Sequence, residues 1–338
     1  MAVLLGSVAC SSSKKKEGGE EPAHLAFRTT FGCCNHSDAS QSFWSKILKK
    51  NPNVWVWLGG AVEVTVPDLT VFQMNYKWQL EDPDYKTFRS QVKITGTWGE
   101  SDYGSEDGTD FVLKNQSRSL FWDFMEIPAA DALRAQSGVY RSETWTVVGN
   151  KVKLVMLDEQ SFRPSANKTH TIYDSTDDDL LGAAQWAWLE KEIADAHDAK
   201  VLLVASGMKA LDAHSYEKWK DFPKSRERLM KILESSSAKV KIVLSGNRAL
   251  GEFGKINFNP DHPENVLYSL TSSALTQSFS GAALDGSRNL LPQTNYGVLD
   301  FLLKDQNFVI DAYLVDLETG NKVADMEIPI VQSTEKEK

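Results

Sequence analysis

The stretch that most constrains the fold is an unbroken apolar run, Val54–Leu58, which ends in the glycine pair Gly59 and Gly60. Consecutive β-branched and aromatic residues are typical of a strand buried on both faces. Ligands of open α/β sheets bind beyond the carboxyl ends of such strands, so these glycines are expected beside a site. The same strand-then-turn pattern recurs at Ile94–Ser101, Leu154–Gln160, Val201–Lys209 and Val240–Ala249. We therefore expect one pocket built from several strand ends.

Helical and strand patterns alternate along the first part of the chain, whereas only strands and turns follow Asn265. This order is compatible with two facing sheets flanked by helices. We expect the strands that begin at Val54, Val92, Val201 and Val240 to share one sheet, and the strands within Asn265–Glu327 to form most of the second. Between Tyr140 and Asp158, alternating residues around Gly149 and Asn150 predict a hairpin.

The composition excludes some classes of function. The formal net charge of −9 argues against a nucleic-acid partner, because phosphate binding needs a basic face. Internal hydrophobic runs are too short to span a bilayer. The three cysteines, Cys10, Cys33 and Cys34, do not form a disulfide framework, and we interpret Cys33 and Cys34 as thiols.

The first residues differ in character from the rest. Residues 1–10 form a short apolar run that ends at Cys10, and residues 11–24 form a polar, low-complexity tether. This arrangement resembles a bacterial lipoprotein signal with Cys10 as the lipidated residue; the alternative is an ordinary N-terminal segment. We expect one domain over residues 25–330, a tail over 331–338, and a place in a bacterial cell envelope, lipid-anchored, periplasmic or extracellular.

Several short motifs are spread along the chain. They are Phe31-Gly32-Cys33-Cys34-Asn35-His36, Leu181-Gly182 with Gln185-Trp186 and Trp188-Leu189, Glu217-Lys218-Trp219 with Phe222-Pro223, Leu270-Thr271-Ser272-Ser273, and Asn295-Tyr296-Gly297. These motifs resemble those of the alkaline phosphatase D (PhoD-like) metallophosphatases, and they occur in that family's order between about residue 27 and residue 330. The resemblance implies an α/β fold of four layers, α/β/β/α, with two facing mixed sheets as in the calcineurin-like metallophosphoesterases. It also implies a two-metal phosphoester hydrolase site.

The positions at which the resemblance places metal ligands are substituted. Gly60 stands where the family has a bridging aspartate, and Ser101 and Ala249 stand where it has histidines. Gly99 and Asn247 replace aspartates. Two close cations need carboxylates to neutralise them, and hydrolysis needs a group that moves protons. The substitutions therefore predict a degenerate pocket.

Some residues at these strand ends keep ligand-capable groups. The residual metal candidates are Cys34, Glu63, Glu100 and Asn247. Asp102 is expected to cap or turn its loop rather than bind metal. Arg248 either pairs with a phosphate or carboxylate or braces its loop. Lys209 adds a cation that replaces some of the lost metal charge.

Three hypotheses of function follow. The favoured one is a pseudophosphatase that acts as a cell-envelope binding or scaffold protein, with no cofactor. The alternative is an active phosphomonoesterase or phosphodiesterase with a rearranged centre that binds Ca, Fe, Zn or Mn. The third is a metal-free enzyme that works through Lys209 and Arg248. The expected partner is a small phosphorylated or anionic ligand or another protein, and the only membrane contact expected is through a lipid on Cys10.

Overall fold

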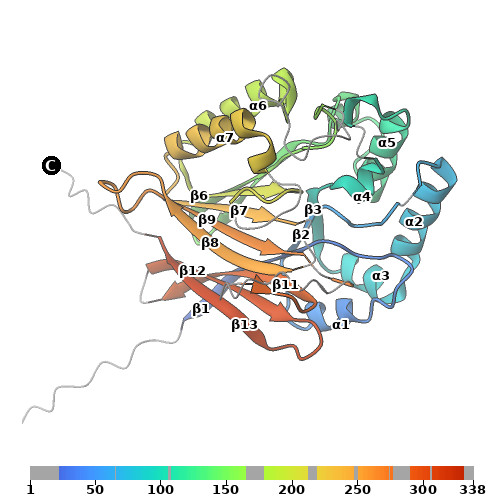
Figure 1. Cartoon of the computed structure of the whole chain (residues 1–338). Coiled ribbons are helices and arrows are strands. Elements are labelled where there is room, and N and C mark those ends of the chain that lie inside the picture. The colour runs from blue at the N-terminus through green and yellow to red at the C-terminus, as the bar shows by residue number, and fades with distance from the viewer. Residues whose placement is uncertain are drawn as a thin grey trace, which may run out of the picture.

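Two β-sheets face each other, and helices cover the outer face of each (Figure 1). The computed structural model describes residues 23–64, 66–105, 108–164, 179–211, 219–246, 250–273, 275–276, 290–304 and 307–330. The first sheet has six strands in the order β13-β12-β11-β1-β2-β3, and the second has seven in the order β10-β8-β9-β7-β6-β5-β4. The predicted four-layer α/β/β/α architecture is therefore confirmed.

The strands of the first sheet are β1 (His24–Gly32), β2 (Val54–Leu58), β3 (Lys93–Thr97), β11 (Asn295–Lys304), β12 (Asn307–Asp316) and β13 (Lys322–Pro329). Those of the second are β4 (Arg141–Val147), β5 (Asn150–Met156), β6 (Ala199–Ser206), β7 (Val240–Ser245), β8 (Gly251–Asn257), β9 (Val266–Ser272) and β10 (Leu290–Leu291). The helices are α1 (Phe43–Leu48), α2 (Leu69–Glu81), α3 (Pro83–Arg89), α4 (Glu100–Tyr103), α5 (Lys114–Phe124), α6 (Gly182–Asp195) and α7 (Pro223–Ser235). Short 3-10 turns are η1 (Gly108–Asp110), η2 (Ala132–Ala135) and η3 (Trp219–Asp221).

The predicted grouping of strands was wrong. β2 and β3 lie in the first sheet beside β1, which pairs antiparallel with β11 from the C-terminal part of the chain. β6 and β7 lie in the second sheet, where β7 pairs in parallel with β9. Each sheet thus combines parallel strands from the N-terminal or middle part of the chain with strands from the C-terminal part. The sequence pattern identifies strands because it reports burial, but it does not report which strand is the neighbour.

The apolar run Val54–Leu58 is buried on both faces. Val54, Val56 and Leu58 face the second sheet and belong to the core between the sheets. Trp55 and Trp57 point the other way, where the ring of Trp44 from α1 packs edge-on against both, at centroid distances of 4.9 and 5.4 Å. A third cluster lies under α6 and α7. The alternation of a strand therefore distributes this run between two cores.

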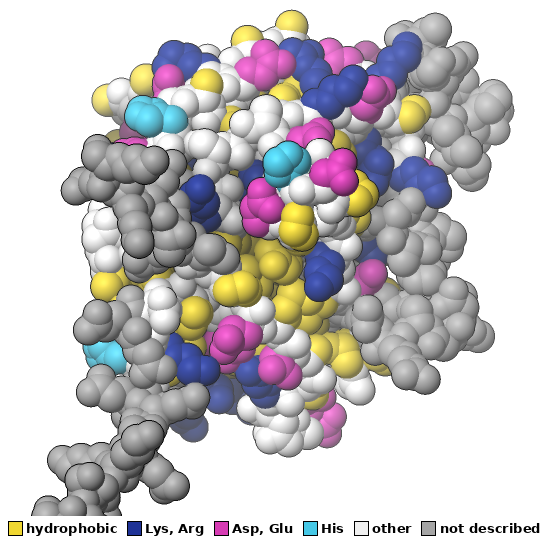
Figure 2. All heavy atoms as spheres, turned by 90° about the vertical axis from the view of Figure 1, so that its left-hand side faces the viewer, with side chains coloured by type: hydrophobic (Ala, Val, Ile, Leu, Met, Phe, Trp, Pro, Cys, Tyr) yellow, Lys and Arg dark blue, Asp and Glu magenta, His cyan; other side chains and the backbone are white. Residues whose placement is uncertain are grey.

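Aromatic side chains also close the core between the sheets. Phe27 of β1 and Trp145 of β4 come from different sheets, and their rings lie 5.5 Å apart. On the face at the left-hand side of Figure 1, hydrophobic side chains gather in the centre and charged ones lie around them (Figure 2).

None of the helices that the structure describes has the length and the apolar character needed to cross a membrane.

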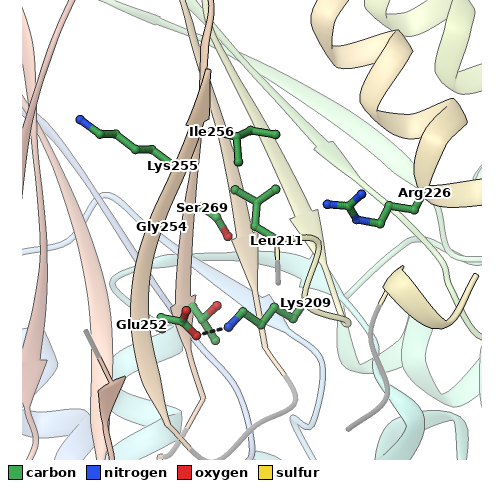
Figure 3. Close-up of a pocket in the computed structure, with 9 residues that line it drawn as sticks. Lys209, Leu211, Arg226, Glu252, Gly254, Lys255, Ile256 and Ser269 are labelled. Atoms are coloured by element: carbon green, nitrogen blue, oxygen red, sulfur yellow. Dashed lines mark hydrogen bonds and ion pairs between the residues drawn. The ribbon is translucent and has the colours of Figure 1, made fainter. Parts of the chain in front are cut away.

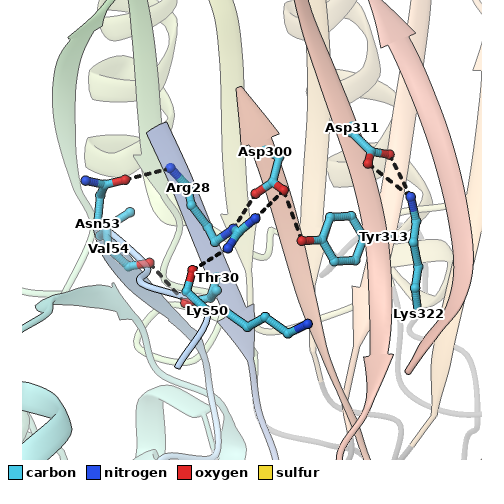
Figure 4. Close-up of polar contacts among 9 residues, drawn as sticks. All are labelled: Arg28, Thr30, Lys50, Asn53, Val54, Asp300, Asp311, Tyr313 and Lys322. Atoms are coloured by element: carbon cyan, nitrogen blue, oxygen red, sulfur yellow. Dashed lines mark hydrogen bonds and ion pairs between the residues drawn. The ribbon is translucent and has the colours of Figure 1, made fainter. Parts of the chain in front are cut away.

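A polar cluster fixes the middle of the first sheet (Figure 4). Arg28 of β1 forms a two-pronged ion pair with Asp300 of β11, with N–O distances of 2.5 and 2.6 Å. The hydroxyl of Tyr313 on β12 donates to the same carboxylate at 3.0 Å. The ion pair joins β1 to β11, and Tyr313 adds β12, so the cluster holds three neighbouring strands in register. Both charged side chains are at most 14% exposed, so water screens the pair weakly.

Candidate active site at the strand ends

The carboxyl ends of the parallel strands meet where the two sheets face each other. We call the segments that follow β2, β3, β5, β6 and β7 the strand-end loops (residues 59–64, 98–104, 157–161 and 207–210, and Gly246). A methyl group placed on Gly246, after β7, would lie 2.3 Å from the carbonyl oxygen of Leu58 on β2. Segments from opposite sheets are thus in direct contact, although the sequence pattern predicted that these strands share one sheet.

Glycines allow the strand-end loops to pack backbone against backbone. A methyl group on Gly59 would lie 2.6 Å from the Gly99 nitrogen, and one on Gly60 would lie 2.8 Å from the Cys34 nitrogen. One on Gly207 would lie 2.7 Å from the Trp98 carbonyl oxygen. Gly59 and Gly60 also have φ of +86° and +57°, a conformation that favours glycine. At these positions the neighbouring backbone occupies the space that a side chain would need.

Asp102, on α4, holds two strand-end loops together. Its buried carboxylate accepts hydrogen bonds from the backbone N–H groups of Gly60 at 2.5 Å, Ala61 at 2.8 Å, Val62 at 3.1 Å and Gly99 at 2.9 Å. Burial raises the pKa of Asp102 to about 6, although the four N–H donors oppose this shift. The carboxylate thus braces the loops after β2 and β3.

Asp158, after β5, has a similar structural role. It accepts hydrogen bonds from the Trp98 indole N–H and the Val139 backbone N–H, both at 2.8 Å. Backbone N–H groups of Gln160 and Ser161, each at 2.9 Å, and the Ser161 hydroxyl at 2.7 Å also donate to it. Asp158 therefore links the loops after β3 and β5, and these donors surround both of its oxygens.

Glu159 is a buried carboxyl that sequence reasoning did not single out. Its Oε2 accepts a hydrogen bond from the Gly207 backbone N–H at 3.0 Å. Its Oε1 has no hydrogen-bond partner among the described residues. Burial raises the pKa of Glu159 to about 8, opposed by the hydrogen bond from Gly207. The side chain is thus mainly protonated at neutral pH.

The residual metal candidates have other contacts. The Cys34 thiol lies 3.0 Å from the Ser273 hydroxyl, which is also 3.1 Å from the Cys33 thiol. Glu63 forms an ion pair with His36, and both side chains are about one-third exposed.

The remaining predicted positions fall into two groups. Glu100 begins α4 and is partly exposed, and the backbone carbonyl of Ser101 accepts from the Val64 N–H at 3.2 Å. Asn247, Arg248 and Ala249 lie outside the described residues. Across the part of the chain that the structure covers, no three His, Cys, Asp or Glu side chains gather in a group able to hold a metal ion.

Lys209 lies at the end of the loop after β6, but its ammonium group is already paired. It forms an ion pair with Glu252 of β8, and the two side chains are 7% and 12% exposed. The pair lies in a pocket between α7 and the strands β8 and β9 (Figure 3). Its positive charge is therefore compensated by Glu252 rather than directed at the contacts between the strand-end loops.

Comparison with known families identifies the domain. Residues 49–296 match the model of the PhoD-like phosphatase family. The chain belongs to this family. Its structure is similar to a solved structure of PhoD, with a TM-score of 0.70 and 13% sequence identity over 92% of this chain and 73% of that chain. No curated protein sequence matches it.

Two further solved structures share the fold of this PhoD-like domain. One is GAP50, the anchor in the inner membrane complex of Plasmodium, with a TM-score of 0.53 and 12% identity over 92% of this chain and 91% of that chain. The other is the purple acid phosphatase PPD1 from yellow lupin seeds, with a TM-score of 0.61 and 10% identity over 90% of this chain and 53% of that chain.

The residues present can be tested against the two-metal centre that the family resemblance implies. The resemblance implies a carboxylate at position 60 that would lie between the cations, and further ligands at the neighbouring strand ends. The Cys34 backbone fills the space beside Gly60, and the backbone of Gly59 and Gly60 lies 3.3–3.4 Å from a methyl group placed on Gly99. The described residues at these positions therefore do not fit a pair of divalent cations.

Proposed function

We propose that this PhoD-like domain has lost phosphoester hydrolysis and acts as a binding or scaffold protein in a bacterial cell envelope. The single observation that carries this proposal is the packing of the strand-end loops. Glycines such as Gly59, Gly60 and Gly207 lie where the segments touch. Backbone atoms of a neighbouring segment fill the space beside each of them. A cavity for two cations and a phosphoester would require these loops to separate.

The carboxylates that remain support the same proposal. Asp102 and Asp158 are surrounded by hydrogen-bond donors from the protein itself, so their oxygens already have partners. Burial raises the pKa of the Glu159 carboxyl to about 8, so this side chain holds its proton more strongly than an exposed glutamate does. Two close cations repel each other and lose hydration, so a centre with so little available negative charge is unfavourable.

The scaffold role draws support from the fold and from the N-terminal segment. The domain keeps a complete pair of sheets and its cores, so a stable surface remains when hydrolysis is lost. The similar fold of GAP50 belongs to a protein described as an anchor, which indicates that this architecture serves in attachment elsewhere. A lipid on Cys10, followed by the polar tether, would place the domain at a membrane surface.

Hydrolysis of p-nitrophenyl phosphate and bis(p-nitrophenyl) phosphate tests this proposal. The purified full chain is assayed with Ca, Mn, Zn or Fe ions in turn, and we expect no turnover above the protein-free blank. Metal-dependent turnover would contradict the proposal.

Turnover that Cys34→Ala, Glu63→Gln or Glu100→Gln abolishes would instead establish the rearranged metal centre. Glu81→Gln, at an exposed carboxylate at the end of α2, is the matched control for these variants. Turnover that persists in all of them would require another site on the chain.

A further inference from the structure

A pocket on the outer side of the second sheet lies apart from the contacts between the strand-end loops. It has a volume of about 170 Å³, which is enough space for several water molecules or a small anion. Its polar lining includes Lys209, Arg226 and Glu252, together with the hydroxyl residues Ser269 and Thr271 of β9. Leu211 and Ile256 add apolar walls. The pocket thus combines charged groups with a small apolar surface.

Arg226 brings an available guanidinium group to this pocket. Its side chain extends from α7 toward the strands β8 and β9 (Figure 3). Its Nε donates to the Ala210 carbonyl oxygen at 3.3 Å, which positions the group. Within the described chain, its two terminal nitrogens make no hydrogen bond or ion pair. A guanidinium fork held in this way matches the two oxygens of a carboxylate or phosphate.

The ion pair of Lys209 and Glu252 supplies the second positive group. An ammonium group has three N–H donors, and Glu252 takes only part of this capacity. The two cations and one carboxylate leave a formal charge of +1 among the three groups. A bound anion would neutralise this charge in a partly buried place, where water screens it weakly.

We propose that this pocket binds an oxyanion, the phosphate or carboxylate group of a small molecule, between Arg226 and Lys209. The guanidinium fork of Arg226 binds two of the oxygens, and the free N–H groups of Lys209 donate to the anion. Leu211 and Ile256 contact the carbon atoms next to it. The proposal does not depend on the loss of hydrolysis, because none of these groups lies in the contacts between the glycines.

Isothermal titration of the full chain with inorganic phosphate and with acetate, at constant ionic strength, tests the proposal. We expect saturable binding of at least one of the two in the millimolar range. Tighter binding of phosphate would assign the site to phosphate groups, and tighter binding of acetate would assign it to carboxylates. Absence of saturable binding of both would overturn the proposal.

A pair of variants, one in the pocket and one at its rim, distinguishes binding at this site from general attraction of anions to a basic surface. Arg226→Gln is expected to weaken binding about tenfold or more, because it removes a charged two-pronged contact. Lys255→Ala is the matched control and should change affinity less than about twofold, since the ammonium group of this rim lysine points away from Arg226 (Figure 3). Equal weakening by the two variants would overturn the proposal.

Glu252→Gln gives a test in the opposite direction. It removes the carboxylate that competes for Lys209, so the affinity should rise by about threefold or more. A general loss of folding would not tighten binding. Unchanged or weaker binding by this variant, with its circular dichroism spectrum like that of the parent, would contradict the proposal.

Discussion

Gly246→Ala tests the backbone contact between the two sheets most locally. The added methyl group would lie 2.3 Å from the Leu58 carbonyl oxygen and 2.7 Å from the Cys33 thiol sulfur. Real methyl groups do not approach other atoms so closely, so the loop after β7 must move. The Leu58 oxygen belongs to a buried strand and cannot rotate away, unlike the end of a flexible side chain.

The expected magnitude follows from this crowding. Overpacking in a dense interior costs about 1–3 kcal/mol, and a rigid backbone neighbour favours the upper end of that range. The substitution also reduces the entropy of the unfolded chain, which offsets about 0.4–1 kcal/mol. We therefore expect Gly246→Ala to lower the free energy of unfolding by about 2 kcal/mol.

Two other glycines separate crowding from backbone strain. Gly254 on β8 has no atom within 4 Å of an added methyl group, so Gly254→Ala should raise the free energy of unfolding by about 0.5 kcal/mol. Gly149 also has open space but a φ of +73°, so Gly149→Ala should lower it by about 1 kcal/mol through strain alone.

Urea denaturation with the slope m monitored gives the free energy for each variant. The predicted order of stability is Gly254→Ala, parent, Gly149→Ala, Gly246→Ala. If Gly246→Ala is as stable as Gly254→Ala, with an unchanged m value, the loops after β2 and β7 are not packed against each other as described.

Three further predictions concern single side chains. Burial raises the pKa of Glu159 to about 8, so the folded parent must lose a proton that the unfolded chain has already released. The parent should therefore lose stability relative to Glu159→Gln as the pH rises from about 5 to 8. Urea denaturation at the two pH values checks this, and a constant difference in the free energy of unfolding would contradict it. Asp300→Asn should lower the free energy of unfolding by about 3 kcal/mol, because it leaves Arg28 poorly paired. Asp311→Asn removes a more exposed ion pair with Lys322 and should lower it by about 1 kcal/mol or less. Equal losses of the two variants on urea denaturation would refute this ranking. Cys10→Ala should release the protein from membranes on cell fractionation, and recovery of the unmodified parent in the cytosol would rule out lipidation.

The sequence was sufficient to predict the layers of the fold, though not the pairing of the strands. The unbroken apolar run Val54–Leu58 indicated β2. β8 was not predicted because Gly251, Gly254 and Lys255 interrupt its pattern. It lies near the edge of its sheet, where burial is partial and the hydrophobic signal is weak.

At the candidate site, the family resemblance predicts which ligand positions are substituted, but it does not predict what fills the space beside them. The role of Asp102 depends on backbone N–H groups that converge only when the loop after β2 adopts positive φ values. The burial of Glu159 depends on contacts between β5 and β6, which no local pattern reports. The recurrence of glycine after β2, β3, β6 and β7 was the signal available, because glycine permits close approach of backbones.

Elemental analysis tests the central claim most directly, namely that these strand ends do not hold a metal pair. The purified full chain is equilibrated with Ca, Mn, Zn or Fe ions, freed of unbound metal, and measured for metal per chain. The packing of Gly60 against Cys34 and the bonding of Asp102 to backbone N–H groups predict well below two equivalents of each metal. Two tightly bound equivalents per chain, accompanied by phosphoester turnover, would contradict the account.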